Sequence, residues 1–384
     1  MPDPSTSRDL RLDFFRGVAL IFIFIDHIPE NILSYFTLEA LGFFDAAEVF
    51  IFISGFTAAL VYGRRLVEKG ALYATAQVLR RAWQLYVAHV FLFVIFIAEV
   101  SYTAATFKNP MYNEEMRVAD FLDEPHVAVV QALLLQFQPT FLDILPLYIL
   151  MLVIFPVVLL GMRRHPLLVL LPSAMLYIAV QVFGIAVPAY PEGHVWYFNP
   201  LAWQFLFVLG AVLGNRSQDA GVAGLMKAAF PVAAVIFVAA LVVKVSWTLH
   251  GVWEGLPGFF LKELWPVNKN NLSPLRLVPF LALVLLVAVL VPRNARFLGS
   301  AAARPLVLCG QQSLEIFCLG ILLSAFGHFI LSEYGSAIVV QLAVNAAGIV
   351  AMLLTAAVID WYKAMDRMPM LQPTAPHRGD KVAR

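Results

Sequence analysis

Residues 11–27 read R-L-D-F-F-R-G-V-A-L-I-F-I-F-I-D-H, and this stretch decides how the chain is organised. Two arginines and an aspartate lead into an uncharged, mostly apolar run that ends at Asp26 and His27. Arg16 and His27 are eleven residues apart, so they share one face of a helix, and His27 lies roughly 16 Å along the axis from Arg16. If Arg16 lies at a membrane surface, we expect His27 near the middle of the apolar layer.

The composition is that of a membrane protein. Hydrophobic residues make up 61% of the chain and charged residues 13%, whereas soluble domains have roughly 45–50% and about 25%. The net charge of +1 argues against a nucleic-acid partner. The two cysteines, Cys309 and Cys318, fall half a turn out of phase in one predicted helix, so we expect neither a disulfide nor a metal site. Asp26 and His27 interrupt the first apolar run, which predicts a retained helix rather than a cleaved signal.

Long apolar stretches predict an all-α, polytopic integral membrane protein with about ten transmembrane helices. The expected spans are 13–33, 47–63, 82–102, 141–161, 167–187, 199–214, 227–247, 274–292, 305–330 and 337–360. The stretch 126–138 is apolar but too short to cross, which indicates an interfacial or re-entrant segment on the outer side.

The basic residues predict the orientation of these helices. Most of the 26 Lys and Arg fall at the two termini or in the even-numbered turns, which places both termini in the cytoplasm. We expect one ten-helix domain over residues 1–367. The tail 368–384 is Pro-rich and polar, which is typical of a disordered segment. The outer loop 248–273, with Trp253 and Trp265, is interpreted either as a sugar-binding mouth or as an interfacial aromatic belt.

His27 and Asp26 are the first candidates for chemistry. A neutral imidazole at this depth is able to act as a general base toward a hydroxyl. A carboxylate is expected to orient the ring, and Asp26 points about 100° away on the helix, so Glu48 or Asp143 are alternatives. The simpler interpretation is a buried histidine that only bonds to a neighbouring helix.

A second set of candidates lies at the cytoplasmic ends. Arg16, within salt-bridge reach of Asp13, precedes Gly17, whose missing side chain is expected to let a ligand approach. We favour binding of a phosphate or carboxylate by Arg16, with a topological anchor as the alternative. The pair Arg80 and Arg81 has the same two interpretations.

The remaining candidates are polar residues within or beside spans. Glu48 and Asp143, at the outer ends of two spans, are interpreted either as functional acids or as helix caps. Gln311 and Glu315 are expected on one face of a single helix, with Gln312 nearby and Glu315 roughly 15 Å deep. They indicate either a substrate channel or hydrogen bonds between helices.

Five segments in order resemble the OpgC family within the membrane acyltransferase-3 superfamily. They are R-D-L-R-L-D-F-F-R-G at 8–17, F-L-D-I-L-P-L-Y at 141–148, N-P-L-A-W-Q at 199–204, L-S-P-L-R at 272–276 and G-Q-Q-S-L-E-I-F-C-L-G at 310–320. The Arg16–His27 spacing, E-V-F-I-F-I-S-G at 48–55 and R-R-x-x-x-L-Y at 80–86 resemble the superfamily more broadly. Where the superfamily has an aspartate in its second span, this chain has Glu48.

The resemblance implies an enzyme of the bacterial inner membrane that transfers a succinyl or similar acyl group from cytoplasmic acyl-CoA to hydroxyls of periplasmic glucan. It implies His27 as the base and Arg16 beside the donor, with no permanently bound cofactor and succinyl-CoA as donor substrate. Trp203 and Gln204 are then expected on the acceptor side or in a channel. The oligomeric state stays open.

Two other functions remain open from the residues. Asp26, His27 and Glu315 would also suit the proton relay of a transporter or flippase for a sugar or acyl compound, although no inverted repeat is evident. The third interpretation is a non-catalytic partner in glucan synthesis or export, whose polar groups only join helices.

Overall fold

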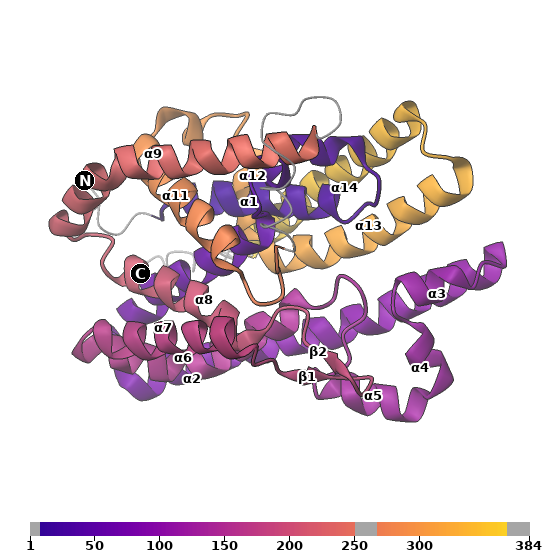
Figure 1. Cartoon of the computed structure of the whole chain (residues 1–384), viewed down its shortest axis with the longest axis horizontal. Coiled ribbons are helices and arrows are strands. Elements are labelled where there is room, and N and C mark those ends of the chain that lie inside the picture. The colour runs from indigo at the N-terminus through magenta and orange to yellow at the C-terminus, as the bar shows by residue number, and fades with distance from the viewer. Residues whose placement is uncertain (1–7, 250–266, 367–384) are drawn as a thin grey trace, which may run out of the picture.

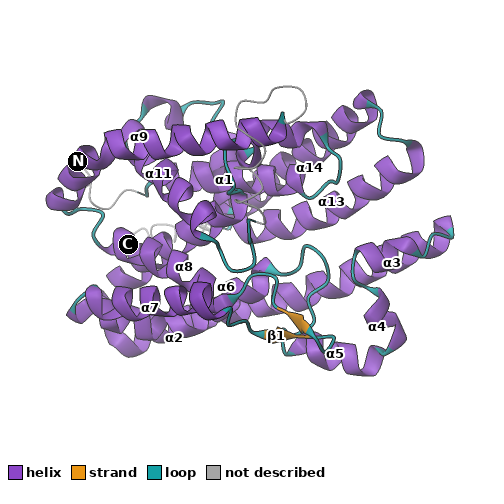
Figure 2. Cartoon of the chain, viewed as in Figure 1, coloured by secondary structure: helices purple, strands orange, loops and turns teal. Residues whose placement is uncertain are grey.

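The computed structural model describes residues 8–249 and 267–366, and almost all of its regular structure is helical (Figures 1 and 2). The longer helices are α1 (Leu10–Asp26), α2 (Ala46–Phe107), α6 (Ile144–Arg164), α7 (Leu167–Phe183), α8 (Pro200–Asn215), α9 (Ala220–Thr248), α11 (Pro274–Leu290), α13 (Ser313–Tyr334) and α14 (Ile338–Met365). The shorter ones are α3 (Met111–Glu115), α4 (Ala119–Asp123), α5 (Pro125–Leu133), α12 (Arg304–Gln311) and the 3-10 turns η2 (Ile32–Phe36), η3 (Leu38–Ala40) and η4 (Arg296–Gly299). Two short strands, β1 (Pro188–Ala189) and β2 (His194–Val195), pair antiparallel.

The all-α class predicted from the sequence is confirmed for the described residues. Five helices are long and apolar enough to cross a membrane, namely α2, α6, α9, α13 and α14. Helices α7, α8 and α11 are apolar but shorter. Each of the ten predicted spans overlaps a helix of the structure, whereas the number of crossings and the side of the termini stay predictions.

Three predicted boundaries are wrong. The first span does not continue to residue 33, because α1 ends at Asp26, and Pro29 and Glu30 (φ 56°) then turn the chain. The second and third spans are the two arms of α2, which is kinked at Gly70. The left-handed φ of 84° at Gly70 is one that a residue without a side chain adopts readily. The ninth span is broken between α12 and α13.

Glycines let two helix pairs pack backbone to backbone. A Cβ on Gly55 of α2 would lie 2.0 Å from the Phe207 carbonyl oxygen of α8, and one on Gly210 would lie 2.3 Å from the Phe52 carbonyl oxygen. In the same way, a Cβ on Gly17 would lie 1.9 Å from the Leu306 carbonyl oxygen of α12. The expectation that Gly17 makes room for a ligand is therefore wrong, since α12 fills that space. Close approach through small residues is typical of helices packed in a membrane.

The stretch predicted as interfacial or re-entrant contains α5, which is too short to cross a bilayer. The hydroxyl of Tyr86 in the second arm of α2 donates to the Leu133 carbonyl at the end of α5 (3.0 Å). Its outer location stays a prediction. Trp253, Trp265 and the tail 368–384 lie outside the described residues.

Polar contacts hold the start of α1 and the end of α14 at the same end of the bundle. Gln311 of α12 donates to Asp13 of α1 (3.4 Å), and Lys363 of α14 donates to the adjacent Gln312. The described ends of the chain therefore lie together, as the prediction of both termini on one side requires.

Candidate functional site

A cavity of about 560 Å³ lies at the end of α1 that carries His27. Its walls come from segments far apart in the sequence: the end of α1, the start of α2, the stretch 137–144, the strand pair with the residues after it, and the segment that leads into α11. Among the predicted site residues, Asp26, His27 and Asp143 line this cavity. Three residues predicted from the sequence therefore belong to one site, whose shape the sequence did not indicate.

The ring of His27 is held by the backbone of its own helix. His27 follows the last residue of α1, and its backbone N–H donates to the Ile23 carbonyl oxygen (3.1 Å). The ring Nδ1 lies 2.5 Å from the same oxygen. A carbonyl oxygen only accepts hydrogen bonds, so Nδ1 carries the proton and the neutral ring keeps its lone pair on Nε2. The edge of the ring also packs against Phe141, with 4.6 Å between centroids.

The carboxylate expected to orient His27 is therefore replaced by a backbone carbonyl. Both oxygens of Asp26 are buried, and neither has a hydrogen-bond partner in the described part of the chain. The nearby Thr37 hydroxyl donates instead to the Ser34 carbonyl (2.9 Å). The Asp26 carboxyl group therefore lies buried at the edge of the cavity, with Thr37 as a polar neighbour.

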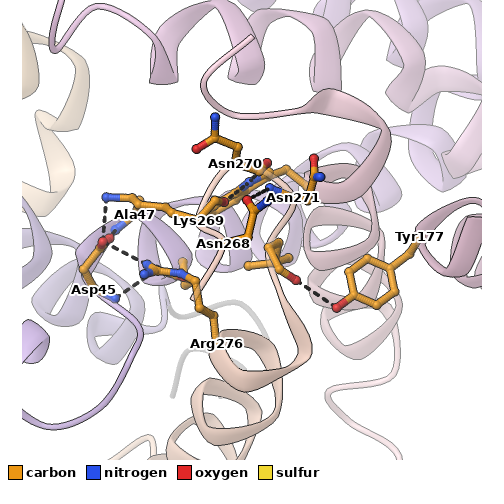
Figure 3. Close-up of polar contacts among 11 residues, drawn as sticks. Asp45, Ala47, Tyr177, Asn268, Lys269, Asn270, Asn271 and Arg276 are labelled. Carbon is orange, nitrogen blue, oxygen red and sulfur yellow. Dashed lines mark hydrogen bonds and ion pairs between the residues drawn. The ribbon is translucent and has the colours of Figure 1, made fainter. Parts of the chain in front are cut away.

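The buried side chains of Glu48 and Arg276 and the partly buried ones of Asp45 and Lys269 form a charged network beside the cavity, and Figure 3 shows Asp45, Lys269 and Arg276 of this network. Arg276 of α11 donates through Nε to Glu48 Oε1 (2.7 Å) and through Nη2 to Asp45 Oδ2 (2.9 Å). Lys269 Nζ lies 2.6 Å from the same Asp45 oxygen. Two acids and two bases thus balance one another, which buried charges require.

Glu48 is a helix cap as well as an ion-pair partner. Its Oε2 accepts from the backbone N–H of Asp45 (3.0 Å), while Asp45 accepts from the N–H of Ala47 (2.8 Å). This is a reciprocal capping box, which satisfies orphan donors at the start of α2. The cap, one of the two interpretations of Glu48, is what the structure describes, and Glu48 contributes no surface to the cavity.

The loop that carries Lys269 is fixed by α7 and α8. Trp203 Nε1 donates to the carbonyls of Lys269 (3.2 Å) and Asn270 (3.1 Å), and the Tyr177 hydroxyl donates to Leu272 (2.8 Å; Figure 3). Gln204 bonds to the side chain and carbonyl of Ser173 in α7. Trp203 and Gln204 were expected beside the acceptor, but they line no described cavity and instead position the loop and α7.

Asp45 and the Lys269 of this loop each stabilise the charged form of the other. Burial alone would raise the pKa of Asp45, but Lys269 and Arg276 outweigh it and hold that pKa well below its ordinary value. Burial would lower the pKa of Lys269, but Asp45 outweighs it and keeps that pKa above the ordinary value. Lys269 also lies over the rings of Tyr197 and Phe198, 5.8 and 5.6 Å from their centroids. Lys269 is therefore a fixed cation in the cavity wall.

The donor-side candidates lie at the other end of α1. Arg16 Nη2 donates to the Thr57 hydroxyl of α2 (2.8 Å). The expected salt bridge between Arg16 and Asp13 is not formed; Asp13 pairs with Arg8, at 2.5 and 2.8 Å. Arg81 lies within electrostatic range of Arg16. Arg80 is exposed on α2.

Gln311 and Glu315 do not share a helix face. Gln312 has non-helical backbone angles (φ −105°, ψ 37°) and separates α12 from α13. Glu315 is half exposed, 3.8 Å from Lys363 near the end of α14. The expected depth of Glu315 is thus wrong, and its contacts are those of a residue at the end of the bundle.

The sequence did not point to Asp45 or to its ion pairs with Lys269 and Arg276, although Lys269 belongs to the loop 248–273 that is interpreted as a sugar-binding mouth or an aromatic belt. The sequence D-A-A-E at 45–48 has the spacing of a capping box, from which the role of Asp45 as a helix cap was predictable. No sequence signal pairs Asp45 with Arg276, because 231 positions separate them.

A family model described as OpgC protein matches residues 8–364, nearly the whole chain. A search of the curated proteins finds no match to this chain.

Proposed function

The chain belongs to the OpgC protein family, and from this premise we propose that it is a membrane O-acyltransferase that modifies periplasmic glucan. In this proposal succinyl-CoA, or a similar acyl-CoA, binds from the cytoplasm. The acyl group passes to a glucan hydroxyl on the outer side of the bacterial inner membrane. The family supports a glucan-modifying membrane enzyme, and the acyl group and the donor are our proposal.

The observation that carries the proposal is the state of His27 in the cavity. Because Nδ1 donates to Ile23, Nε2 is the atom able to accept a proton. The neighbouring Asp26 carboxylate has no partner of its own. A hydroxyl nucleophile requires a base that takes its proton, and a carboxyl group beside that base is able to hydrogen-bond the incoming molecule.

The proposed reaction uses these groups in turn. The acceptor hydroxyl gives its proton to His27 Nε2 as its oxygen attacks the thioester carbonyl carbon. A C–O bond forms, the C–S bond breaks, and the proton on Nε2 passes to the leaving thiolate. The products are a glucan ester and free CoA, so every atom and charge is accounted for.

The two ends of α1 suit the two substrates. Arg16 and Arg81 would meet the anionic donor at one end, since guanidinium groups bind phosphate and carboxylate well. At the other end, the rings of Tyr190 and Tyr197 and the carboxylates of Asp26 and Asp143 line a cavity fit for a sugar. Stacking on rings and hydrogen bonds to carboxylates are the contacts that a sugar makes.

Mass spectrometry of periplasmic glucan tests this function. Cells that carry the protein should contain succinylated glucan, and cells that lack it or carry His27→Ala should not. A His27→Ala protein that inserts in the membrane and still gives wild-type levels of acylated glucan would refute His27 as the base. Unmodified glucan in cells with the wild-type protein would refute the activity.

A proton-coupled transporter is the second candidate, favoured by the unpartnered Asp26 beside His27. Counterflow of a sugar in liposomes without any acyl donor would support the transporter. Transfer of label from acyl-CoA to glucan by the purified protein would support the enzyme.

A further inference from the structure

The cavity that holds His27 also contains a lysine whose hydrogen-bond donors are only partly used by the protein. Lys269 lines this cavity, and its Nζ lies 2.6 Å from Asp45 Oδ2. Among the described residues, Asp45 is the one carboxylate that forms an ion pair with Lys269. An ammonium group carries three N–H donors. Because one carboxylate oxygen does not occupy all three, Lys269 keeps donors for a molecule in the cavity.

Lys269 is the most exposed member of the charged network. Its side chain is 29% exposed, against 13% for Asp45, 10% for Arg276 and 0% for Glu48. Arg276 contacts the same Asp45 oxygen (2.9 Å), and Figure 3 shows the two cations approaching Asp45 from different directions. Asp45 is therefore shared between two cations and does not fully neutralise Lys269.

Lys269 faces the same space as the proposed base. Both residues line the cavity, and Lys269 lies within electrostatic range of His27. Asp26 and Asp143 are also within electrostatic range of Lys269, but neither forms an ion pair with it. The backbone of Lys269 is fixed, since its carbonyl accepts from Trp203 Nε1 (3.2 Å). A cation thus occupies a defined position in the cavity of the base.

The proposed donor has two ends that leave the thioester carbonyl in opposite directions. Sulfur and the rest of CoA lie on the side of Arg16, which is roughly 16 Å from His27 along α1. The acyl chain lies on the other side of the carbonyl carbon, toward the cavity. A succinyl chain ends in a carboxylate, two methylene groups beyond the thioester carbonyl. This carboxylate enters the cavity when the thioester reaches His27.

We propose that Lys269 binds the terminal carboxylate of the acyl group and thereby selects dicarboxylic acyl donors. The inference rests on the function proposed above and names the residue that sets its acyl group. An ammonium donates charge-assisted hydrogen bonds to a carboxylate, which are stronger than bonds between neutral groups. Holding the far end of the acyl chain also keeps the thioester carbonyl beside the base. A neutral chain of the same length gains neither effect.

The test compares two donors with the purified protein in nanodiscs and a neutral gluco-oligosaccharide as acceptor. The donors are succinyl-CoA and butyryl-CoA, whose acyl chains have the same length but end in a carboxylate and a methyl group. We expect the wild type to show a kcat/KM about 10- to 100-fold higher for succinyl-CoA, the size that hydrogen bonds to a charged group give. Lys269→Gln should lower this ratio at least about tenfold, and Lys269→Arg, which keeps the charge, should retain most of it.

Arg117 provides the matched control. It is an exposed cation that lines the same cavity and lies outside the charged network. Arg117→Gln should leave the ratio unchanged. Lys269→Gln should fold, because Asp45 keeps Arg276 as its partner, and thermal unfolding checks this. A merely structural role of Lys269 would lower the rates with both donors alike and leave their ratio unchanged.

The outcomes separate this inference from the proposed function. Equal rates with the two donors in the wild type would overturn the selection while leaving the acyltransferase intact, and this comparison needs no variant. Transfer from neither donor would overturn the proposed function itself. A ratio unchanged in a folded Lys269→Gln, or lowered in Arg117→Gln alone, would overturn the assignment to Lys269.

Discussion

At the scale of single residues, the end of α1 orients the ring of His27, which is the base in the proposed reaction. Its ring is oriented by the Ile23 carbonyl of the preceding turn, so no second helix is needed to hold the tautomer. A carboxylate partner would strongly stabilise the charged ring, whereas a carbonyl mainly decides which nitrogen of the neutral ring carries the proton. The proposed reaction requires the neutral form, because only a neutral ring is able to accept a proton from a hydroxyl.

We expect His27→Asn to separate positioning from proton transfer. The Asn amide keeps a donor near the Ile23 carbonyl but offers no base, so acyl transfer should fall by about 10²–10⁴-fold while the protein stays folded. Initial rates and thermal unfolding in detergent would measure the two effects. Activity near that of the wild type would contradict the role of Nε2.

Arg276 should behave as a buried partner rather than as a surface charge. Arg276→Gln leaves Glu48 buried and unpaired in the interior, which typically costs about 3–5 kcal/mol. The double variant Glu48→Gln, Arg276→Gln removes both charges and should regain much of the loss. Thermal unfolding of the three proteins gives the order of stability. A double variant as unstable as the single one would contradict the pairing.

The sequence showed some site residues and hid others for a physical reason. Asp26, His27 and Asp143 are ionisable groups within or beside apolar runs. Burying such a group in a membrane costs free energy, so its presence in the sequence indicates a functional site. Lys269 lies in a polar loop, where a lysine is ordinary. Its importance comes from Asp45 across the fold, and such a pairing leaves no local pattern.

At the scale of elements, sequence periodicity found the helices better than their ends. The length of an apolar run predicts a span, but breaks depend on backbone angles that apolarity does not report. Gly70 and Gln312 both interrupt helices, and only the first is a residue type that signals a break. The contact of α12 with Gly17 was equally unpredictable from the sequence, because α12 is distant along the chain.

The close packing of α2 on α8 gives a prediction for Gly210. A Cβ there would meet the Phe52 carbonyl at 2.3 Å, and overpacking of this kind costs about 1–3 kcal/mol. Gly210→Ala should therefore lower the unfolding temperature. Gly224→Ala in α9 is the control, because nothing lies within 4 Å of its Cβ position. If the two variants unfold alike, α2 and α8 do not pack as described.

At the scale of the whole molecule, the topology depends on whether α7 and α8 each cross the membrane. These helices have 17 and 16 residues, which is about 26 and 24 Å at 1.5 Å per residue. An apolar layer is about 30 Å thick, so both are slightly short. Yet the hairpin between them carries Tyr190 and His194 of the cavity, while Arg163 and Arg216 flank the opposite ends of the pair. This separation of cavity and arginines favours two crossings.

Single cysteines placed in a protein with Cys309→Ala and Cys318→Ala test this topology. We expect a membrane-impermeant maleimide to label Glu192→Cys in spheroplasts, and to label His165→Cys and Gln218→Cys only after permeabilisation. If α7 and α8 do not cross, all three positions share one side and label together, which removes two of the ten spans. If Glu192→Cys alone needs permeabilisation, the orientation is inverted. The His27 cavity would then face the cytoplasm, where a periplasmic glucan cannot reach the base.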